Sequence, residues 1–248
     1  MRSSRIITVS NHKGGTGKTT STLNVGKALS NSDVKCLLVD IDSQANLSQS
    51  LRADEEVMTI ADALSRKIDH LPIKVIDDFL HIVPASLELS SVEPGLYSNF
   101  TNYFLLKQLL DKVRDNYDFI IIDCPPSLGI LTQNALIASD SILITVQSQF
   151  LSLKGLNTIY NLVQTIQEKL NPTLKVEGLL LTQTNNTRLS KDIVSSLKKS
   201  FQGKVFSTTI RQNISLAEAS ASRQDIFSYK PNSYGAIDYM NLAKEILL

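Results

Sequence analysis

Several features that would place this chain in a membrane or an oxidising compartment are missing from its sequence. No apolar run is long enough to cross a bilayer, and the N-terminus lacks the basic and apolar regions of a signal peptide. Only two cysteines occur, Cys36 and Cys124. Each lies in or just after an apolar segment, which predicts buried, reduced thiols. We therefore expect a cytoplasmic protein.

The sequence also lacks a strong net charge, internal repeats, low-complexity segments and a recognisable linker. Its net charge is +1, which indicates no particular partner. The charge is unevenly distributed, however. Residues 186–230 contain eight Lys or Arg and three Asp or Glu, a local charge of +5 against −4 for the remainder. Because 248 residues suffice for one large core, we expect a single domain, residues 1–248, with an anion-facing surface in its last quarter.

Short β-branched runs alternate with longer segments of helical periodicity along the chain. This alternation is typical of βαβ units, and it predicts an α/β fold with one doubly wound, mostly parallel sheet and helices on both faces. The expected strands cover residues 6–9, 34–40, 79–84, 119–123, 141–146 and 176–181. The expected helices cover residues 18–29, 103–113, 153–170, about 190–200 with Ser190 as the cap, and 234–247.

A glycine-rich loop follows the first expected strand and opens the first expected helix. It reads Lys13-Gly14-Gly15-Thr16-Gly17-Lys18-Thr19-Thr20. Glycines let backbone N–H groups approach phosphate oxygens, and a helix N-terminus favours anions. Lys18 would reach the β- and γ-phosphates, and the Thr19 hydroxyl would bind Mg²⁺. The literal P-loop pattern requires a glycine where His12 stands, and an additional lysine, Lys13, precedes the glycine pair.

Carboxylates end two of the expected strands. Asp40 and Asp42 follow one apolar run, and Asp123 follows another. Ligands of open parallel sheets bind beyond the carboxyl ends of the strands, which is also where the phosphate loop emerges. We therefore expect Asp42 and Asp123 to serve the magnesium site with Thr19, with Asp40 ranked behind them. A second carboxylate can orient an attacking water.

These segments resemble the ParA/MinD family of ATPases with a deviant Walker A motif. Residues 13–19 resemble its phosphate loop, residues 40–46 its switch I, and residues 123–129 its Walker B and switch II. Residues 218–219, 229–236 and 242–245 are similar to the ParA/Soj branch. The resemblance covers nearly the whole chain. No helix-turn-helix precedes the loop, so we expect the short, Soj-like form.

The resemblance implies an ATPase that dimerises face to face when it binds ATP and magnesium. Lys13 would reach the partner's phosphates, Asp42 would position the water, and Asp123 would hold the magnesium shell. The ATP-bound dimer would bind DNA without sequence preference on the nucleoid. Hydrolysis stimulated by a ParB-like centromere-binding protein would release it and so partition chromosomes or plasmids. The adenine would lie near Asn185, Ile210 and Arg211, where this chain reads Ile-Arg-Gln-Asn instead of Ile-Pro-Arg-Asn.

The DNA surface is expected in the basic last quarter. Non-specific binding needs cations that neutralise phosphates and no base-reading constellation. A helix after Ser190 would bury Ile193, Val194, Leu197 and Phe201 and turn its lysines to solvent. The candidate DNA-binding residues are Lys191, Lys198, Lys199, Lys204 and Arg223, with Arg211 as a further possible member.

Three other functions share parts of this pattern. A MinD-like membrane-cycling ATPase needs a basic amphipathic C-terminal helix, but the last expected helix carries a single lysine, Lys244, so no membrane partner is expected. An iron–sulfur reductase needs two suitably placed cysteines at a dimer face, which Cys36 and Cys124 do not offer. A ParA-like ATPase that positions a protein complex would use the same chemistry, and the sequence leaves it open.

Overall fold

The computed structural model describes residues 4–248 except 56, 149–152, 186 and 202; the side chains of 153, 154, 189, 192, 198 and 200 also lie outside the description. A seven-stranded sheet, in the order β3-β4-β2-β5-β1-β6-β7, runs through this part of the chain. β3 is antiparallel to β4, and the other neighbours are parallel, as predicted. The strands are β1 (Arg5–Ser10), β2 (Cys36–Asp40), β3 (Lys74–Val75), β4 (Leu80–Val83), β5 (Phe119–Asp123), β6 (Ser141–Gln147) and β7 (Lys175–Thr182).

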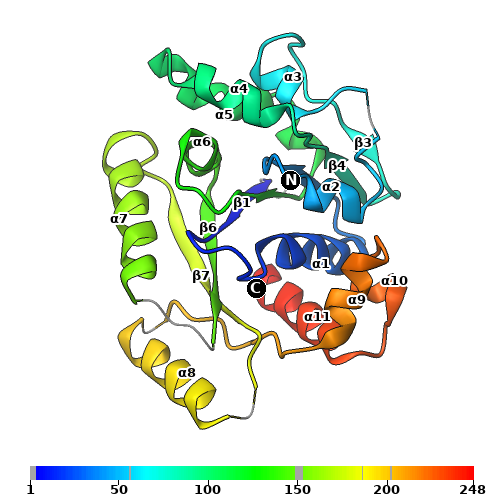
Figure 1. Ribbon diagram of the computed structural model, residues 1–248, viewed down its shortest axis with the longest axis vertical. Coiled ribbons are helices and arrows are strands. Elements are labelled where there is room, and N and C mark those ends of the chain that lie inside the picture. The colour runs from blue at the N-terminus through cyan, green and yellow to red at the C-terminus, as the bar shows by residue number, and fades with distance from the viewer. Residues whose placement is uncertain (1–3, 56, 149–152, 186, 202) are drawn as a thin grey trace.

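Helices cover both faces of this sheet (Figure 1). The α-helices are α1 (Lys18–Ser30), α2 (Asn46–Ser50), α3 (Ile60–Leu64), α4 (Leu89–Leu96), α5 (Leu105–Asp111), α6 (Ile130–Ala138), α7 (Leu153–Lys169), α8 (Arg188–Ser200), α9 (Ile214–Ala221), α10 (Ile226–Tyr229) and α11 (Tyr234–Leu247). Two 3₁₀ turns, η1 (Phe100–Phe104) and η2 (Arg114–Asn116), flank α5.

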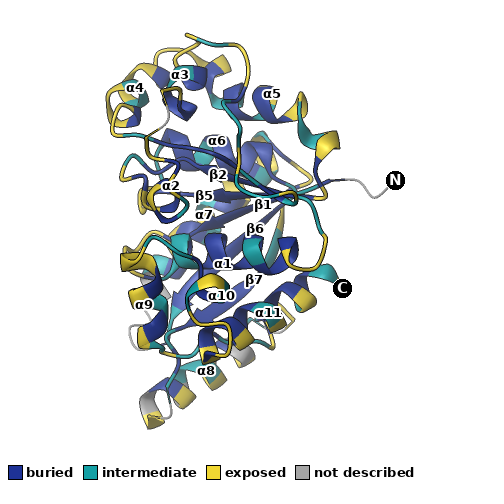
Figure 2. Ribbon diagram, turned by 90° about the vertical axis from the view of Figure 1, so that its right-hand side faces the viewer, coloured by how far each residue is buried: buried dark blue, intermediate teal, exposed yellow. Residues whose placement is uncertain are grey.

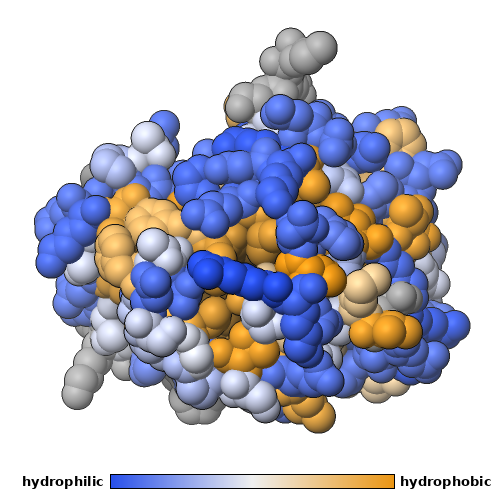
Figure 3. Space-filling view, turned by 90° about the horizontal axis from the view of Figure 1, so that it is seen from above, coloured by the Kyte–Doolittle hydropathy of each residue, from blue (hydrophilic) through white to orange (hydrophobic). Residues whose placement is uncertain are grey.

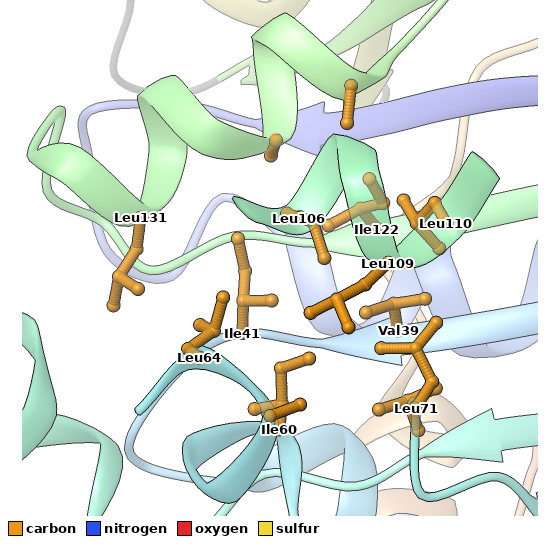
Figure 4. Close-up of a cluster of buried hydrophobic side chains, with 14 of the residues drawn as sticks. Val39, Ile41, Ile60, Leu64, Leu71, Leu106, Leu109, Leu110, Ile122 and Leu131 are labelled. Carbon is orange, nitrogen blue, oxygen red and sulfur yellow. The ribbon is translucent and has the colours of Figure 1, made fainter. Parts of the chain in front are cut away.

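Successive side chains along each strand point to opposite faces of the sheet. Ile120 and Ile122 of β5 point to the layer of α3–α6, whereas Ile121 points to the layer of α1 and α9–α11. Because both faces are covered, the central strands β2 and β5 are fully buried and apolar up to their final aspartates (Figure 2). Figure 4 shows one of these cores, where Val39 and Ile122 of the sheet meet Ile60, Leu64, Leu106 and Leu109 of the helices.

Some expected elements differ from those observed. The predicted helix 103–113 is only partly α-helical, because Tyr103 and Phe104 belong to η1 and the α-helix is Leu105–Asp111. Ser190 does not cap α8: the Thr187 hydroxyl accepts the Ser190 backbone N–H (3.3 Å) and begins the helix at Arg188. The sequence analysis did not identify β3 or the short helices α2, α3, α4, α6, α9 and α10.

No helix in the described part of the chain is long and apolar enough to span a bilayer. The end of the molecule formed by α3–α5 is seen directly in Figure 3, where hydrophobic side chains are scattered among hydrophilic ones. Exposed apolar residues near this end include Val57, Leu87 and Phe100.

Gly26 allows α1 to pack closely on β2. A Cβ atom at Gly26 would lie 2.6 Å from the Leu38 Cδ2 atom, and Leu38 is fully buried and cannot easily move aside. We expect Gly26→Ala to lower the free energy of unfolding by about 1–3 kcal/mol through overpacking, despite the better helix propensity of alanine. Urea unfolding followed by circular dichroism measures it.

Gly95 in α4 is the matched control for this substitution. A Cβ there would meet nothing within 4 Å, so Gly95→Ala should leave the free energy of unfolding unchanged or raise it by about 0.5 kcal/mol. Equal effects of the two substitutions would show that the spacing between α1 and β2 is not limited by Gly26.

Candidate nucleotide-binding site

The loop between β1 and α1 has the backbone of a phosphate-binding loop. Gly15 and Gly17 adopt left-handed conformations, with φ of 73° and 85°, which side-chain-bearing residues rarely adopt. Gly17 is also the N-cap of α1, so the loop leads directly into the helix N-terminus. The loop is held against the end of β7, because the Gln183 amide donates to the Gly15 carbonyl (3.0 Å) and the Thr182 hydroxyl donates to the Thr16 carbonyl (2.9 Å).

A pocket of about 370 Å³ opens above this loop. Of the predicted nucleotide residues, Gly14, Gly15, Gly17, Lys18, Thr19 and Thr20 line it, together with Asp42. Two predicted residues of the loop itself do not. Thr16 is buried and its hydroxyl pairs with that of Thr145 (2.9 Å), whereas Lys13 is exposed and lies outside the pocket lining.

Lys18 is a buried ammonium at the floor of this pocket. Its Nζ donates to the Lys13 carbonyl (3.2 Å), which draws the side chain back over the loop. Burial lowers the pKa of Lys18, while the negative charge of Asp123 acts to raise it. An anion in the pocket would neutralise the positive charge of Lys18 further.

Asp123 lies fully buried at the end of β5, beneath α1. Its Oδ1 accepts a hydrogen bond from the Thr22 hydroxyl (3.4 Å), and its Oδ2 has no hydrogen-bond partner in the described part of the chain. Burial and the nearby charge of Asp40 raise the pKa of Asp123, and the neighbouring Thr19 hydroxyl opposes that rise. An orphaned buried carboxylate oxygen beside a threonine hydroxyl fits a hydrated Mg²⁺ ion, whose positive charge and waters would satisfy it.

Asp40 and Asp42 have different roles although they are only one residue apart. Asp40 is fully buried, and its oxygens accept from the Asp42 backbone N–H (3.1 Å) and from the Ser48 backbone N–H (3.0 Å) and hydroxyl (2.7 Å). The pKa of Asp40 is raised to about 6, because the effect of burial outweighs that of the hydrogen bonds from Ser48. Asp40 thus holds α2 in place, whereas Asp42 lines the pocket.

The loop after Asp123 is held from several sides. The Ile130 backbone N–H donates to the Tyr97 hydroxyl (3.0 Å), and the Thr132 hydroxyl donates to the Ser127 carbonyl (2.6 Å). A Cβ on Gly129 would meet the Glu93 Oε1 at 2.9 Å, so α4 lies close against this loop. Pro126, in the same loop, reaches the pocket lining.

One wall of the pocket was missed by the sequence analysis. It comes from α9 and the turn after it, which contribute Leu216, Ala219, Ser220 and Gln224, and the opposite wall carries Gln44, Asn46 and Ser50. The Asn213 N-cap, whose side chain accepts the Ser215 backbone N–H (2.9 Å), was a sequence signal that could have revealed α9.

The predicted adenine residues do not line the phosphate pocket. Ile210 is 2% exposed and its side chain packs in the core. Arg211 forms an ion pair with Asp238 (2.6 Å) and lies over the Tyr234 ring, 4.1 Å from its centroid. Arg211 and Asn185 instead line a second, larger groove of about 1070 Å³ between α8 and the segment before α9.

The predicted DNA-binding residues fall into two separate places. Lys191, Lys199 and Lys204 are exposed on α8 and the turn after it, while the side chain of Lys198 lies outside the described residues. Arg223 is elsewhere, in the turn between α9 and α10, where its guanidinium pairs with Asp54. Figure 1 shows α9 apart from α8, so Arg223 lies away from the α8 lysines. Its charge is also neutralised within the fold by Asp54.

Comparison with known proteins identifies the family. The profile of a family described as AAA domain matches residues 4–176. The sporulation initiation inhibitor protein Soj of Bacillus subtilis is 41% identical over 98% of both chains. This chain belongs to the ParA/Soj family of chromosome-partitioning ATPases. The chromosome partitioning protein ParA of Myxococcus xanthus is 36% identical over 98% of this chain and 88% of its own.

Solved structures agree with the ParA-family fold. The cobyrinic acid a,c-diamide synthase of Mycobacterium smegmatis, solved with ADP and magnesium bound, superposes with a TM-score of 0.85. It is 29% identical, over 98% of this chain and 94% of its own. As a ParA-family P-loop ATPase, this chain carries the phosphate loop, Asp42 and Asp123 at one edge of the sheet, where the strands' carboxyl ends meet.

Proposed function

We propose that this chain is a magnesium-dependent partition ATPase acting on chromosomes or plasmids. Its ATP-bound homodimer would bind DNA without sequence preference, and hydrolysis stimulated by a ParB-like partner would release it. The observation that carries the proposal is the pocket lined by the phosphate loop and Asp42, with the orphaned, buried carboxylate of Asp123 beside Lys18 and Thr19 of its lining. The similarity to Soj and ParA supports a role in partition.

Each residue of the pocket has a distinct role in this proposal. The backbone N–H groups of the loop and the Lys18 ammonium would bind the β- and γ-phosphates. Thr19 and Asp123 would hold the magnesium ion, which when bound supplies positive charge to the phosphates. Asp42, at the pocket wall, would orient the attacking water.

Lys13 would act on the nucleotide of the partner subunit. Its side chain is exposed and lies outside the lining of its own pocket, which leaves room for it to reach across a dimer interface. A cation delivered in trans neutralises charge that develops on the transferred phosphoryl group, as an arginine finger does.

The DNA surface is proposed on α8, where Lys191 and Lys199 are exposed. Each lysine would neutralise one phosphate, and a dimer would present two such surfaces, so dimerisation would raise the affinity. The adenine is proposed to lie toward Asn185, where the end of β7 approaches the phosphate loop.

The test is binding to random duplex DNA with ATP, ADP or no nucleotide. We expect binding with ATP only, and we expect Lys191→Glu with Lys199→Glu to weaken it about 10-fold or more and to flatten its salt dependence. Fluorescence anisotropy across a salt series measures both, while analytical ultracentrifugation checks that ATP-dependent dimers persist.

The matched control changes two exposed lysines at the amino end of β7, one at the end of α7 and one at the start of the strand. Lys169→Glu with Lys175→Glu alters the net charge equally but should leave DNA binding nearly unchanged. ATP-dependent dimers that bind no DNA would reject the partition proposal and favour a protein or membrane cargo.

A further inference from the structure

An arginine bridges the two walls of the nucleotide pocket. The Arg223 Nε–H donates to the Gln49 carbonyl (2.9 Å), and its guanidinium pairs with the Asp54 carboxylate. Gln49 belongs to α2, and Asp54 follows α2 in the chain. Arg223 follows α9, so these contacts join segments that are 169 and 174 residues apart in the sequence.

Both partners of this bridge are tied closely to residues that line the pocket. On one side, Ala53 donates its backbone N–H to the Ser48 carbonyl (2.8 Å), which holds Asp54 against the end of α2 next to Ser50. On the other side, Arg223 donates its own backbone N–H to the Ser220 carbonyl (3.0 Å). In Figure 2, α2 and α9 lie on the same side of the molecule, as these contacts require.

The backbone conformation of Arg223 indicates that its side chain has a function. Its φ is 54°, in the left-handed region that costs free energy in any residue with a Cβ and that glycine adopts readily. Glycine at this position would therefore suit the local backbone better. An arginine that adopts a strained conformation and joins two segments that line a pocket is a candidate functional residue.

We propose that Arg223, the Gln49 carbonyl and Asp54 form a latch that slows the release of bound nucleotide. The inference rests on the proposed nucleotide binding and adds a residue that sets how long the nucleotide stays. The walls joined by the latch carry Asn46 and Ser50 on one side and Ser220 and Gln224 on the other. A nucleotide enclosed between them leaves only when the walls part, which the latch opposes.

The latch is weak enough to open and close. The side chains of Arg223 and Asp54 are 40% and 26% exposed, and an ion pair of this exposure adds only modestly to stability. Together with the hydrogen bond to Gln49, it should slow release by about 3- to 10-fold. Because the ion pair is accessible to solvent, salt should weaken this retention.

Release of a fluorescently labelled ADP, chased with excess unlabelled ADP in the presence of magnesium, tests the latch. Arg223→Gly and Asp54→Ala should each release the label about 3- to 10-fold faster, and the double variant no faster than either alone. The reversed pair, Arg223→Asp with Asp54→Arg, should restore part of the retention.

Thermal unfolding separates a latch from a merely structural contact. Arg223→Gly relieves the left-handed strain, so its melting temperature should equal or exceed that of the wild type even though the nucleotide leaves faster. Lys107→Ala, which removes an ion pair to Asp111 on α5, is the control and should leave the release rate unchanged.

The outcomes distinguish the latch from the function on which it rests. Wild-type protein that fails to retain labelled ADP would overturn both. Retention by the wild type with unchanged release from Arg223→Gly and Asp54→Ala would overturn the latch alone. Faster release that appears only together with a lower melting temperature would also overturn it.

Discussion

Asp42→Ala should abolish ATP turnover, with kcat falling about 100-fold or more, while the affinity for ATP changes little. Asp42 lines the pocket, and its Oδ1 accepts the Gln44 backbone N–H (3.0 Å), which aims the carboxylate. A carboxylate that orients the attacking water acts in the chemical step and adds little to binding of the nucleotide. Steady-state phosphate release and titration with ATP measure the two quantities separately.

A mixture of two inactive variants tests whether Lys13 acts on the partner subunit's site. Lys13→Ala and Asp42→Ala should each be inactive alone, but a mixed dimer has one site with an intact Asp42 and an intact Lys13 from the partner. An equimolar mixture should recover about a quarter of wild-type activity, since about half of its dimers are mixed and each has one complete site. No recovery, from variants that still dimerise, would show that Lys13 acts within its own subunit.

The affinity of Asp42→Ala for ATP distinguishes two roles for this carboxylate. If Asp42→Ala bound ATP much more weakly, its carboxylate would be holding the nucleotide or its metal rather than the water. Asp40→Ala is an unsuitable comparison, because Asp40 holds Ser48 and its loss would disturb α2. Asp42→Asn, which keeps the size of the side chain and its acceptor for Gln44, is the better one.

The second large effect is expected at Lys18. Lys18→Ala should weaken ADP and ATP binding by about 10- to 100-fold, because it removes a charge-assisted contact to phosphate. It also leaves the buried charge of Asp123 without its nearby cation. Calorimetric titration with ADP, in the presence of magnesium, gives the dissociation constant.

Lys27→Ala provides the matched control on the same helix. Lys27 forms an ion pair with Asp77 (2.5 Å) and lies outside the pocket lining. Its loss removes one lysine from α1 and should leave the dissociation constant of ADP unchanged. Equal weakening by both substitutions would mean that α1 had been disturbed as a whole and that Lys18 has no special contact with phosphate.

The sequence alone was sufficient for features whose signals are local. The alternation of apolar strands with helical segments predicted the parallel sheet, and the glycines before Lys18 predicted the loop that opens α1. The apolar runs ending in Asp42 and Asp123 placed both carboxylates at the correct edge of the sheet. Each of these signals is contained in about ten neighbouring residues, so no long-range contact was needed to recognise it.

Tertiary structure decided what the remaining polar residues do. Asp40 and Asp42 look alike in sequence, but only the packing of Ser48 makes Asp40 structural. Arg211 and Arg223 looked like nucleotide and DNA contacts, yet each pairs with a carboxylate that is distant in the sequence, Asp238 or Asp54. A charged side chain finds its partner only when the chain has folded, because long-range contacts leave no periodicity in the sequence. The Asn213 cap could have revealed α9 itself, but the place of α9 beside the phosphate loop and the pairing of Arg223 with Asp54 are visible only in the folded protein.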